Sequence, residues 1–250
     1  MNYFWYTEET IPQGLGFAHF GPIHLICLGL TVLCAVLGAF FYRRLGEQGR
    51  KRFRLTVAVL MIIDEFFKDI SLIVLGLWTP DYLPLHLCNI NLFVCAFYAL
   101  RPSKALGNYL YTVCIPGALA ACLFPSWTEL PAWNFMFLHS TTCHIMLVMY
   151  PVALTAGGDI RPSVKDLPRC LLILLGLAGV AGIANLIIGG DANFFFLCFA
   201  DPGNPLYIFE QAFGSHLIGF PVIIAGVLLV MQTPWGVADA IQNAKFKMQN

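Results

Sequence analysis

Long apolar runs separated by short polar segments cover most of this 250-residue chain. Each run is close to the roughly 20 residues that an α-helix needs to cross the hydrocarbon core of a membrane. The pattern therefore predicts an all-α, polytopic membrane protein that forms a single domain over 1–250, with seven transmembrane helices. The expected spans are about 17–42, 55–78, 84–100, 107–125, 133–156, 168–190 and 213–232.

Positive charge divides the connecting segments into two sets. Of the 14 Lys and Arg residues, all but Lys68 fall in four segments, and the intervening external segments contain none. Lys and Arg are enriched in cytoplasmic loops, so the alternation predicts an external N-terminus and a cytoplasmic C-terminus. The basic segments are 43–54, 101–104, 161–169 and 245–247.

Composition narrows the expected partners. The chain is 58% hydrophobic and 11% charged, and its formal net charge is zero. Basic residues spread over four loops indicate membrane topology and contact with anionic headgroups, not a nucleic-acid surface. Membrane lipid is therefore the expected partner. No soluble protein partner is implied, and no cofactor is expected.

Polar side chains inside the spans collect in the outer half of the membrane. Buried polar groups are costly there and need partners or a function. We take this layer as the candidate site, which opens toward the outer leaflet. Its members are His24, Asp64, Glu65, Lys68, Asp69, His86, Cys88, Asn89, Asn91, His139 and His144.

The second span carries four of these charges in the sequence IIDEFFKDI. Asp64 and Lys68, like Glu65 and Asp69, are four residues apart, so all four share one helix face. Fully ionised, the quartet carries a net charge of −2. This charge predicts a partner such as an imidazolium, or carboxyl groups that stay protonated. Either a structural ion network or a proton relay fits the pattern.

The third span begins LPLHLCNINLF and offers a thiol, Cys88. A thiol near His, Asn and a cation can act as a nucleophile, although a single membrane cysteine is more often a packing residue. His86 is two residues away and does not face Cys88 on a helix. Asn89 and Asn91, together with Lys68, are candidate hydrogen-bond donors to a developing oxyanion.

The fifth span offers the base, in FLHSTTCHIMLVMYP. His139 and His144 are five residues apart, roughly 140° around an α-helix, so the two rings cannot point to the same place. Either one lies at a height that reaches Cys88, and helix rotation decides between them. No HxxxH or HxxH pair puts two ligands on one helix face, so no metal site is expected. The last span has no Lys to bind retinal.

The external segment 191–212 is unusually aromatic for a loop. A lid folded onto the outer mouth of the bundle would explain its apolar character, and an interfacial aromatic belt explains it equally well. Pro116 and Gly117 are expected to kink the fourth span and to allow a neighbouring helix to approach closely.

Four motifs together resemble the YwaF family of bacterial seven-span proteins. They are LPLHLCNINLF, GALAACLFP, a mid-membrane His followed by an apolar run to Pro151, and ANFFFL. That family is similar to the eukaryotic transmembrane protein 164, an acyltransferase that acts on ether phospholipids through a membrane Cys and His. The resemblance implies a catalytic Cys88 and places the histidine on His144, with His139 as the alternative. It also implies that the protein is located in a bacterial cytoplasmic membrane.

Three hypotheses for function follow. The first is an intramembrane acyltransferase or acyl-ester hydrolase that uses a Cys-His pair on a phospholipid or fatty-acyl substrate. The second is a proton-coupled transporter of small solutes that uses the charged face of the second span. The third is a non-enzymatic lipid-binding protein in which the polar layer is structural.

Overall fold

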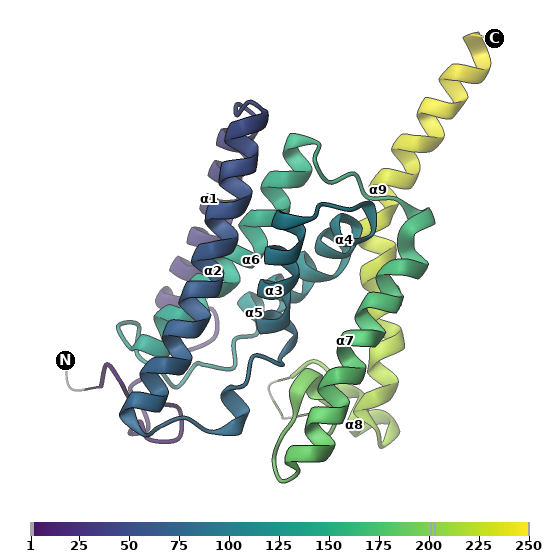
Figure 1. The fold of residues 1–250 in the computed structure, drawn as a ribbon. Coiled ribbons are helices and arrows are strands. Elements are labelled where there is room, and N and C mark those ends of the chain that lie inside the picture. The colour runs from purple at the N-terminus through teal and green to yellow at the C-terminus, as the bar shows by residue number, and fades with distance from the viewer. Residues whose placement is uncertain (1–2, 201, 203, 250) are drawn as a thin grey trace.

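The computed structural model describes residues 3–200, 202 and 204–249, and that part of the chain is built from helices without strands (Figure 1). The helices are α1 (Pro22–Tyr42), α2 (Glu47–Leu75), α3 (Leu87–Leu100), α4 (Lys104–Tyr109), α5 (Ile115–Leu123), α6 (Phe135–Gly157), α7 (Leu167–Ile188), α8 (Tyr207–Phe213) and α9 (Gly219–Gln249). One π-helical turn, η2 (Leu110–Cys114), joins α4 to α5. Short 3-10 turns are η1 (Pro80–Tyr82), η3 (Val164–Asp166), η4 (Phe194–Phe196) and η5 (His216–Ile218).

Helices lie at all seven expected spans, but they do not qualify equally as membrane spans. Within the described residues, five helical stretches are long and apolar enough to cross a membrane. Helix α3 has 14 residues, and α2 contains several charges along its 29 residues. The structure therefore supports an all-helical protein with five candidate spans, and the count of seven stays a prediction.

Several helix boundaries differ from the expected ones for local reasons. Helix α1 begins only at Pro22, because Gly21 is its N-cap and Pro favours the first helical turn. Helix α2 begins at Glu47, so the basic segment that was expected to be a loop is largely helical. The fourth span contains the π-helical turn η2 immediately before Pro116, where a kink was expected.

Helix α6 is the centre of the bundle. It packs against α1, α2, α3 and α5. In its most apolar 18-residue stretch, 56% of the residues are buried. In the corresponding stretches of α1 and α7 only 11% of the residues are buried, and many exposed side chains of these helices are large and apolar. Contiguous apolar surface of this extent is typical of a membrane-facing exterior. Polar side chains near α6 are therefore the ones withdrawn from lipid.

The aromatic segment before the last long helix folds partly onto the bundle. Phe194 is fully buried, and the Asn185 side chain holds its backbone through hydrogen bonds of 2.8 and 3.1 Å. Phe196 and Phe199, by contrast, are 39% and 37% exposed. The segment thus combines inward packing with outward aromatic residues, and both interpretations of 191–212 describe part of it. Residues 201 and 203 lie outside the described residues.

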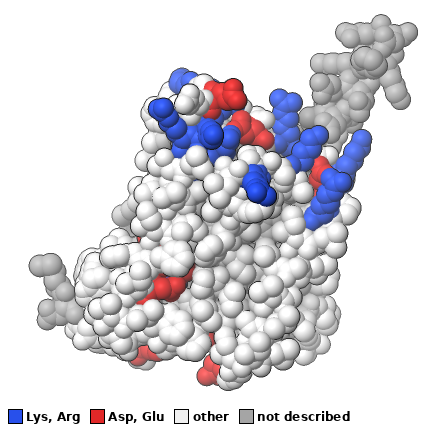
Figure 2. All heavy atoms as spheres, in the orientation of Figure 1, with Lys and Arg blue, Asp and Glu red and all other residues white. Residues whose placement is uncertain are grey.

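Lys and Arg side chains gather at one end of the molecule, which we call the basic end (Figure 2). The arginines of α2, the Arg101 loop and the loop between α6 and α7 all contribute to it. The predicted orientation would place the basic end in the cytoplasm. The candidate site lies toward the opposite end, since Glu65 is about 27 Å along α2 from Glu47 at 1.5 Å per residue.

Candidate functional site

The charged face of α2 is buried against its neighbours. Glu65 and Lys68 are 1% and 3% exposed, and Lys68 Nζ donates to Glu65 Oε1 at 2.6 Å. The same ammonium donates to the Tyr82 carbonyl at 3.1 Å and lies 3.2 Å from Asp69 Oδ1. An ammonium group has three N–H donors. Two of them are used in the hydrogen bonds to Glu65 and Tyr82, while the contact with Asp69 has the distance of an ion pair without the geometry of a hydrogen bond.

Helix α3 contributes a further hydrogen bond to this group. Asn89 Nδ2 donates to Glu65 Oε2 at 2.8 Å. Asn91, two residues on, is 1% exposed and accepts a hydrogen bond from the Tyr109 hydroxyl at 3.0 Å. One asparagine thus joins α3 to α2, and the other joins α3 to α4.

His139 is the partner that the negative charge of α2 requires. Its Nδ1 lies 2.9 Å from Asp64 Oδ2, and its Nε2 lies 3.6 Å from Glu65 Oε2. The contact with Asp64 has the distance of an ion pair without the angle of a hydrogen bond. A protonated His139 would reduce the net charge of the cluster from −2 to −1. We call Asp64, Glu65, Lys68, Asp69 and His139 the buried ion cluster.

His144 has a different environment from His139, as their separation along the helix predicts. It is 8% exposed, and its ring stacks on Trp127 with centroids 4.8 Å apart. Its Nδ1 lies 2.6 Å from the Ser140 carbonyl oxygen. A carbonyl can only accept, so Nδ1 carries the proton and Nε2 has the free lone pair. His144 therefore differs from His139, whose ring nitrogens lie beside two carboxylates.

Cys88 lies in the first turn of α3 and packs against the hydrophobic core. Its thiol makes no hydrogen bond to any residue in the described part of the chain. His86 is turned away from it, and its ring packs against Phe194 with centroids 5.0 Å apart.

The start of α3 also presents unpaired backbone donors. The N-cap residue His86 supplies no side-chain hydrogen bond, and the first backbone bond of the helix runs from Ile90 N to His86 O. The N–H groups of Leu87, Cys88 and Asn89 consequently have no partner among the described residues. Unpaired N–H groups and the helix dipole together favour negative charge at this position.

His24 is committed to the backbone on both sides of its ring. Its Nδ1 accepts from Phe20 N at 2.8 Å, and its Nε2 donates to the Cys122 carbonyl at 2.7 Å. It is 2% exposed. Both nitrogens are occupied, so His24 joins α1 to α5 and is not available as a proton acceptor.

A small cavity lies between α1, α5 and α6. Its volume is about 20 Å³, which is enough for one water molecule. Trp127 lines the cavity on one face and stacks on His144. Thr141 also lines it, with an Oγ1 that is buried and has no hydrogen-bond partner among the described residues. His144 and this mainly apolar cavity therefore share Trp127 as an aromatic neighbour.

Sequence reasoning did not single out Trp127 or Asp159. Trp127 lies in the loop between α5 and α6, and no pattern linked it to a histidine on another helix. Asp159 follows Gly158, the residue that ends α6, and accepts hydrogen bonds from Tyr42, Arg50 and Arg54. An acidic residue directly after a helix end within a basic loop is a signal that could have found it.

The fold and the site together define an integral membrane protein with charged and polar side chains buried between apolar helices. A model of the TMEM164 family matches residues 19–232, and the chain belongs to that family. No curated protein and no solved structure matches the chain.

Proposed function

We propose that the protein is an intramembrane acyl-transfer enzyme that acts on ester-linked acyl chains of a membrane lipid, with Cys88 as the nucleophile and His144 as the base. The observation that carries the proposal is the position of Cys88 in an uncapped helix turn whose N–H groups have no partner. Such a turn stabilises a thiolate and also the oxyanion that forms when the thiolate attacks a carbonyl.

The histidine environments favour His144 over His139 as the base. His139 lies between two carboxylates, and its role there is electrostatic. His144 has its Nδ1 proton directed at a carbonyl, which leaves Nε2 as the acceptor. This is the tautomer that a general base needs. Membership of the TMEM164 family is consistent with a function in lipid chemistry.

The reaction proceeds in two balanced steps. His144 Nε2 takes the proton from Cys88 Sγ, and the thiolate attacks the ester carbonyl to form a tetrahedral intermediate. This intermediate expels the lipid alkoxide, which takes the proton back from the imidazolium, and a thioester remains on Cys88. In the second step Nε2 deprotonates an acceptor hydroxyl, which attacks the thioester and expels the Cys88 thiolate. The thiolate takes this proton from the imidazolium, and the thiol and the neutral imidazole are restored. Water as the acceptor gives hydrolysis, and a lysolipid gives transfer.

Labelling by a phospholipid with an alkyne-tagged acyl chain tests this proposal. The purified protein in lipid vesicles is expected to take up a label that hydroxylamine removes, as a thioester requires. Cys88→Ala is expected to abolish the label. His144→Gln is expected to slow labelling by about 10²-fold or more, because general-base catalysis contributes a factor of that size.

Cys143→Ala is the matched control, since Cys143 is a buried thiol in the middle of α6 and not at a helix start. It is expected to label like the wild type. Undiminished labelling of Cys88→Ala would remove Cys88 from the mechanism.

The buried ion cluster favours a second candidate, a proton-coupled transporter of small solutes. Its contacts form a continuous path from Asp69 through Lys68 and Glu65 to His139 and Asp64. Under this hypothesis Asp64→Asn abolishes proton-linked flux into liposomes, and Cys88→Ala has no effect on it. If Asp64→Asn leaves such flux intact, or if the wild type shows no flux, the transporter hypothesis fails.

A further inference from the structure

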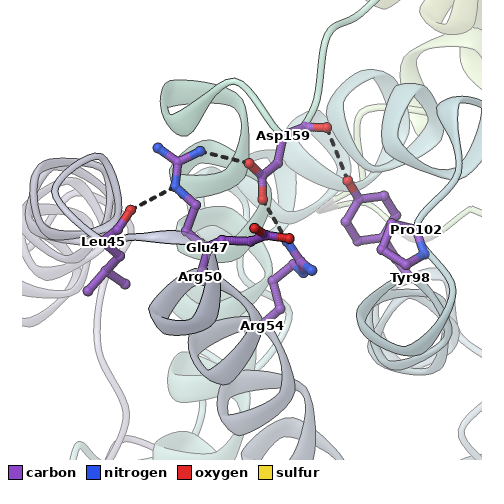
Figure 3. Close-up of a pocket in the computed structure, with 7 residues that line it drawn as sticks. All are labelled: Leu45, Glu47, Arg50, Arg54, Tyr98, Pro102 and Asp159. Atoms are coloured by element: carbon purple, nitrogen blue, oxygen red, sulfur yellow. Dashed lines mark hydrogen bonds and ion pairs between the residues drawn. The ribbon is translucent and has the colours of Figure 1, made fainter.

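A cavity lined by charged residues lies at the basic end, away from the candidate site. Its volume is about 410 Å³, and α2, the α1–α2 loop, α3 and the segment after α6 line it (Figure 3). Arg50 and Arg54 both contact the Asp159 carboxylate, and the Tyr98 hydroxyl reaches the Asp159 carbonyl oxygen (Figure 3). A volume of this size lies within the range of small-molecule sites.

Internal contacts hold both arginines of the wall in place. Arg50 Nε donates to the Leu45 carbonyl at 3.1 Å, and its Nη1 donates to the Gly157 carbonyl at 2.7 Å and to Asp159 Oδ1 at 2.9 Å. Arg54 Nη1 donates to Asp159 Oδ2 at 2.7 Å. The two guanidinium groups are therefore positioned before any ligand arrives, which lowers the entropic cost of binding.

The arginines have more donors than Asp159 can satisfy. The Asp159 carboxylate already accepts from Arg50, Arg54 and the Tyr42 hydroxyl. Arg54 Nε is nevertheless buried without a hydrogen-bond partner among the described residues. No hydrogen bond in that part of the chain engages Nη2 of Arg50 or of Arg54 either. Three guanidinium nitrogens of the two arginines thus lack an acceptor among the described residues, and a guanidinium fork matches a phosphate group.

The four charged residues that line the cavity sum to zero, so the excess of positive charge at this end comes from residues outside the lining. Asp159 is compensated by its two arginines, and further Lys and Arg side chains gather at this end of the molecule (Figure 2). Glu47 is the lining acid that forms no ion pair in the described part of the chain. Glu47 is the first residue of α2 and lines the same cavity, so its carboxylate repels a bound anion.

We propose that this cavity is a binding site for a phosphate-bearing anion, held by Arg50 and Arg54. A lipid headgroup and a free phosphate compound share this chemistry, and the cavity lies where either could reach it if the basic end borders the headgroup layer. The site is separate from Cys88 and does not depend on the proposed acyl transfer.

Calorimetric titration of the purified full chain in a neutral detergent tests the soluble source, with inorganic phosphate and glycerol 3-phosphate as probes at constant ionic strength. Native mass spectrometry after reconstitution with phosphatidylglycerol and phosphatidylcholine tests the lipid source. We expect saturable binding of at least one phosphate probe, or retention of phosphatidylglycerol in preference to phosphatidylcholine. Absence of both overturns the proposal.

Three variants separate a built site from diffuse attraction. Arg54→Gln is expected to weaken binding about tenfold or more, because it removes a charge-assisted hydrogen bond. Glu47 forms no ion pair in the described part of the chain, so the Glu47→Gln variant is expected to fold normally. The variant should bind the anion about threefold more tightly, because the substitution removes a nearby negative charge. Lys51→Gln is the matched control, an exposed charge of the same helix outside the lining, and should leave affinity unchanged.

A loss of affinity in Lys51→Gln equal to that in Arg54→Gln would show only diffuse electrostatics and would overturn the proposal. If Arg54→Gln fails to fold, Glu47→Gln decides, because unchanged or weaker binding in that variant contradicts a site at this wall.

Discussion

Helix α2 carries an ion cluster near each of its ends, and the two differ in burial. At the basic end Arg50 and Arg54 bind Asp159, and the three side chains are 17–26% exposed. About 22 Å along the same helix, the side chains of Glu65 and Lys68 are 1% and 4% exposed. The first cluster borders a cavity, and the second is enclosed by α3 and α6.

The difference teaches what each cluster can do. Partly exposed charges attract external ions and are screened by salt, so they suit recognition of ions at a membrane boundary. Buried charges cannot be screened, and each depends on the partner that compensates it. The buried ion cluster therefore makes α2, α3 and α6 adopt one fixed arrangement, and that arrangement places Asn89 and Cys88 at the start of α3 beside α6.

The sharpest test of this comparison is Glu65→Gln, which should have the largest effect. The change removes the ion pair of Lys68 and leaves a buried ammonium without its closest counter-charge. We expect a loss of about 3–5 kcal/mol in the free energy of unfolding. Titration with sodium dodecyl sulfate in mixed micelles measures it.

The double variant Glu65→Gln with Lys68→Met provides the control for that measurement. It removes both charges, so much of the lost stability should return. A double variant as unstable as the sum of the two single ones would contradict the view that Glu65 and Lys68 compensate each other.

Asp159→Asn should have an intermediate effect at the other end of α2. It weakens charge-assisted hydrogen bonds from Arg50 and Arg54, and we expect a loss of about 2 kcal/mol in the free energy of unfolding. Because the basic-end charges are partly exposed, 1 M NaCl should reduce this loss while leaving that of Glu65→Gln nearly unchanged. Equal salt dependence at both ends would remove the distinction between them.

Asp166→Asn is the matched comparison for Asp159→Asn. Asp166 pairs with Arg169, which is 69% exposed, at 3.1 Å in the loop and first turn of α7. A surface ion pair of this kind contributes little, so we expect a loss below about 0.5 kcal/mol in the same titration. A loss as large as that of Asp159→Asn would show that the number of partners around Asp159 does not matter.

Tyr98→Phe should have the smallest effect of the variants within the two clusters. Its hydroxyl donates to the Asp159 carbonyl at 3.3 Å, and that single neutral hydrogen bond is long. We expect a loss of about 1 kcal/mol or less in the free energy of unfolding. The Asp159→Asn loss should stay the same in the Tyr98→Phe background, since the two changes affect different atoms of Asp159.

Hydropathy predicted the helices well because a membrane span leaves the backbone no alternative to internal hydrogen bonds. It missed the start of α2 and the end of α9. Helix α2 begins at Glu47, before its apolar run, and α9 continues to Gln249, beyond its apolar run. Helix propensity acts there without any help from lipid, and a hydropathy pattern does not register it. The shortness of α3 follows from its N-cap at His86, which the apolar run before it concealed.

The sequence predicted which residues form the candidate site, but it did not predict which of them contact each other. Helical spacing put the four charges of α2 on one face and set His139 and His144 apart. It could not tell that Lys68 would pair with Glu65 and Asp69 and that Asp64 would face His139. Those pairings depend on how α6 and α3 rotate about their axes when they pack against α2.

By itself the sequence determined that this chain forms apolar helices, that its basic residues collect at one end, and that charged residues must be buried between helices. These properties follow from local composition and from a fixed rise and turn per residue. Only the tertiary structure decided that Asp159 closes a network with Tyr42, Arg50 and Arg54, and that Trp127 stacks on His144. Such contacts join residues far apart in the chain, and helix packing, which no local pattern encodes, brings them together.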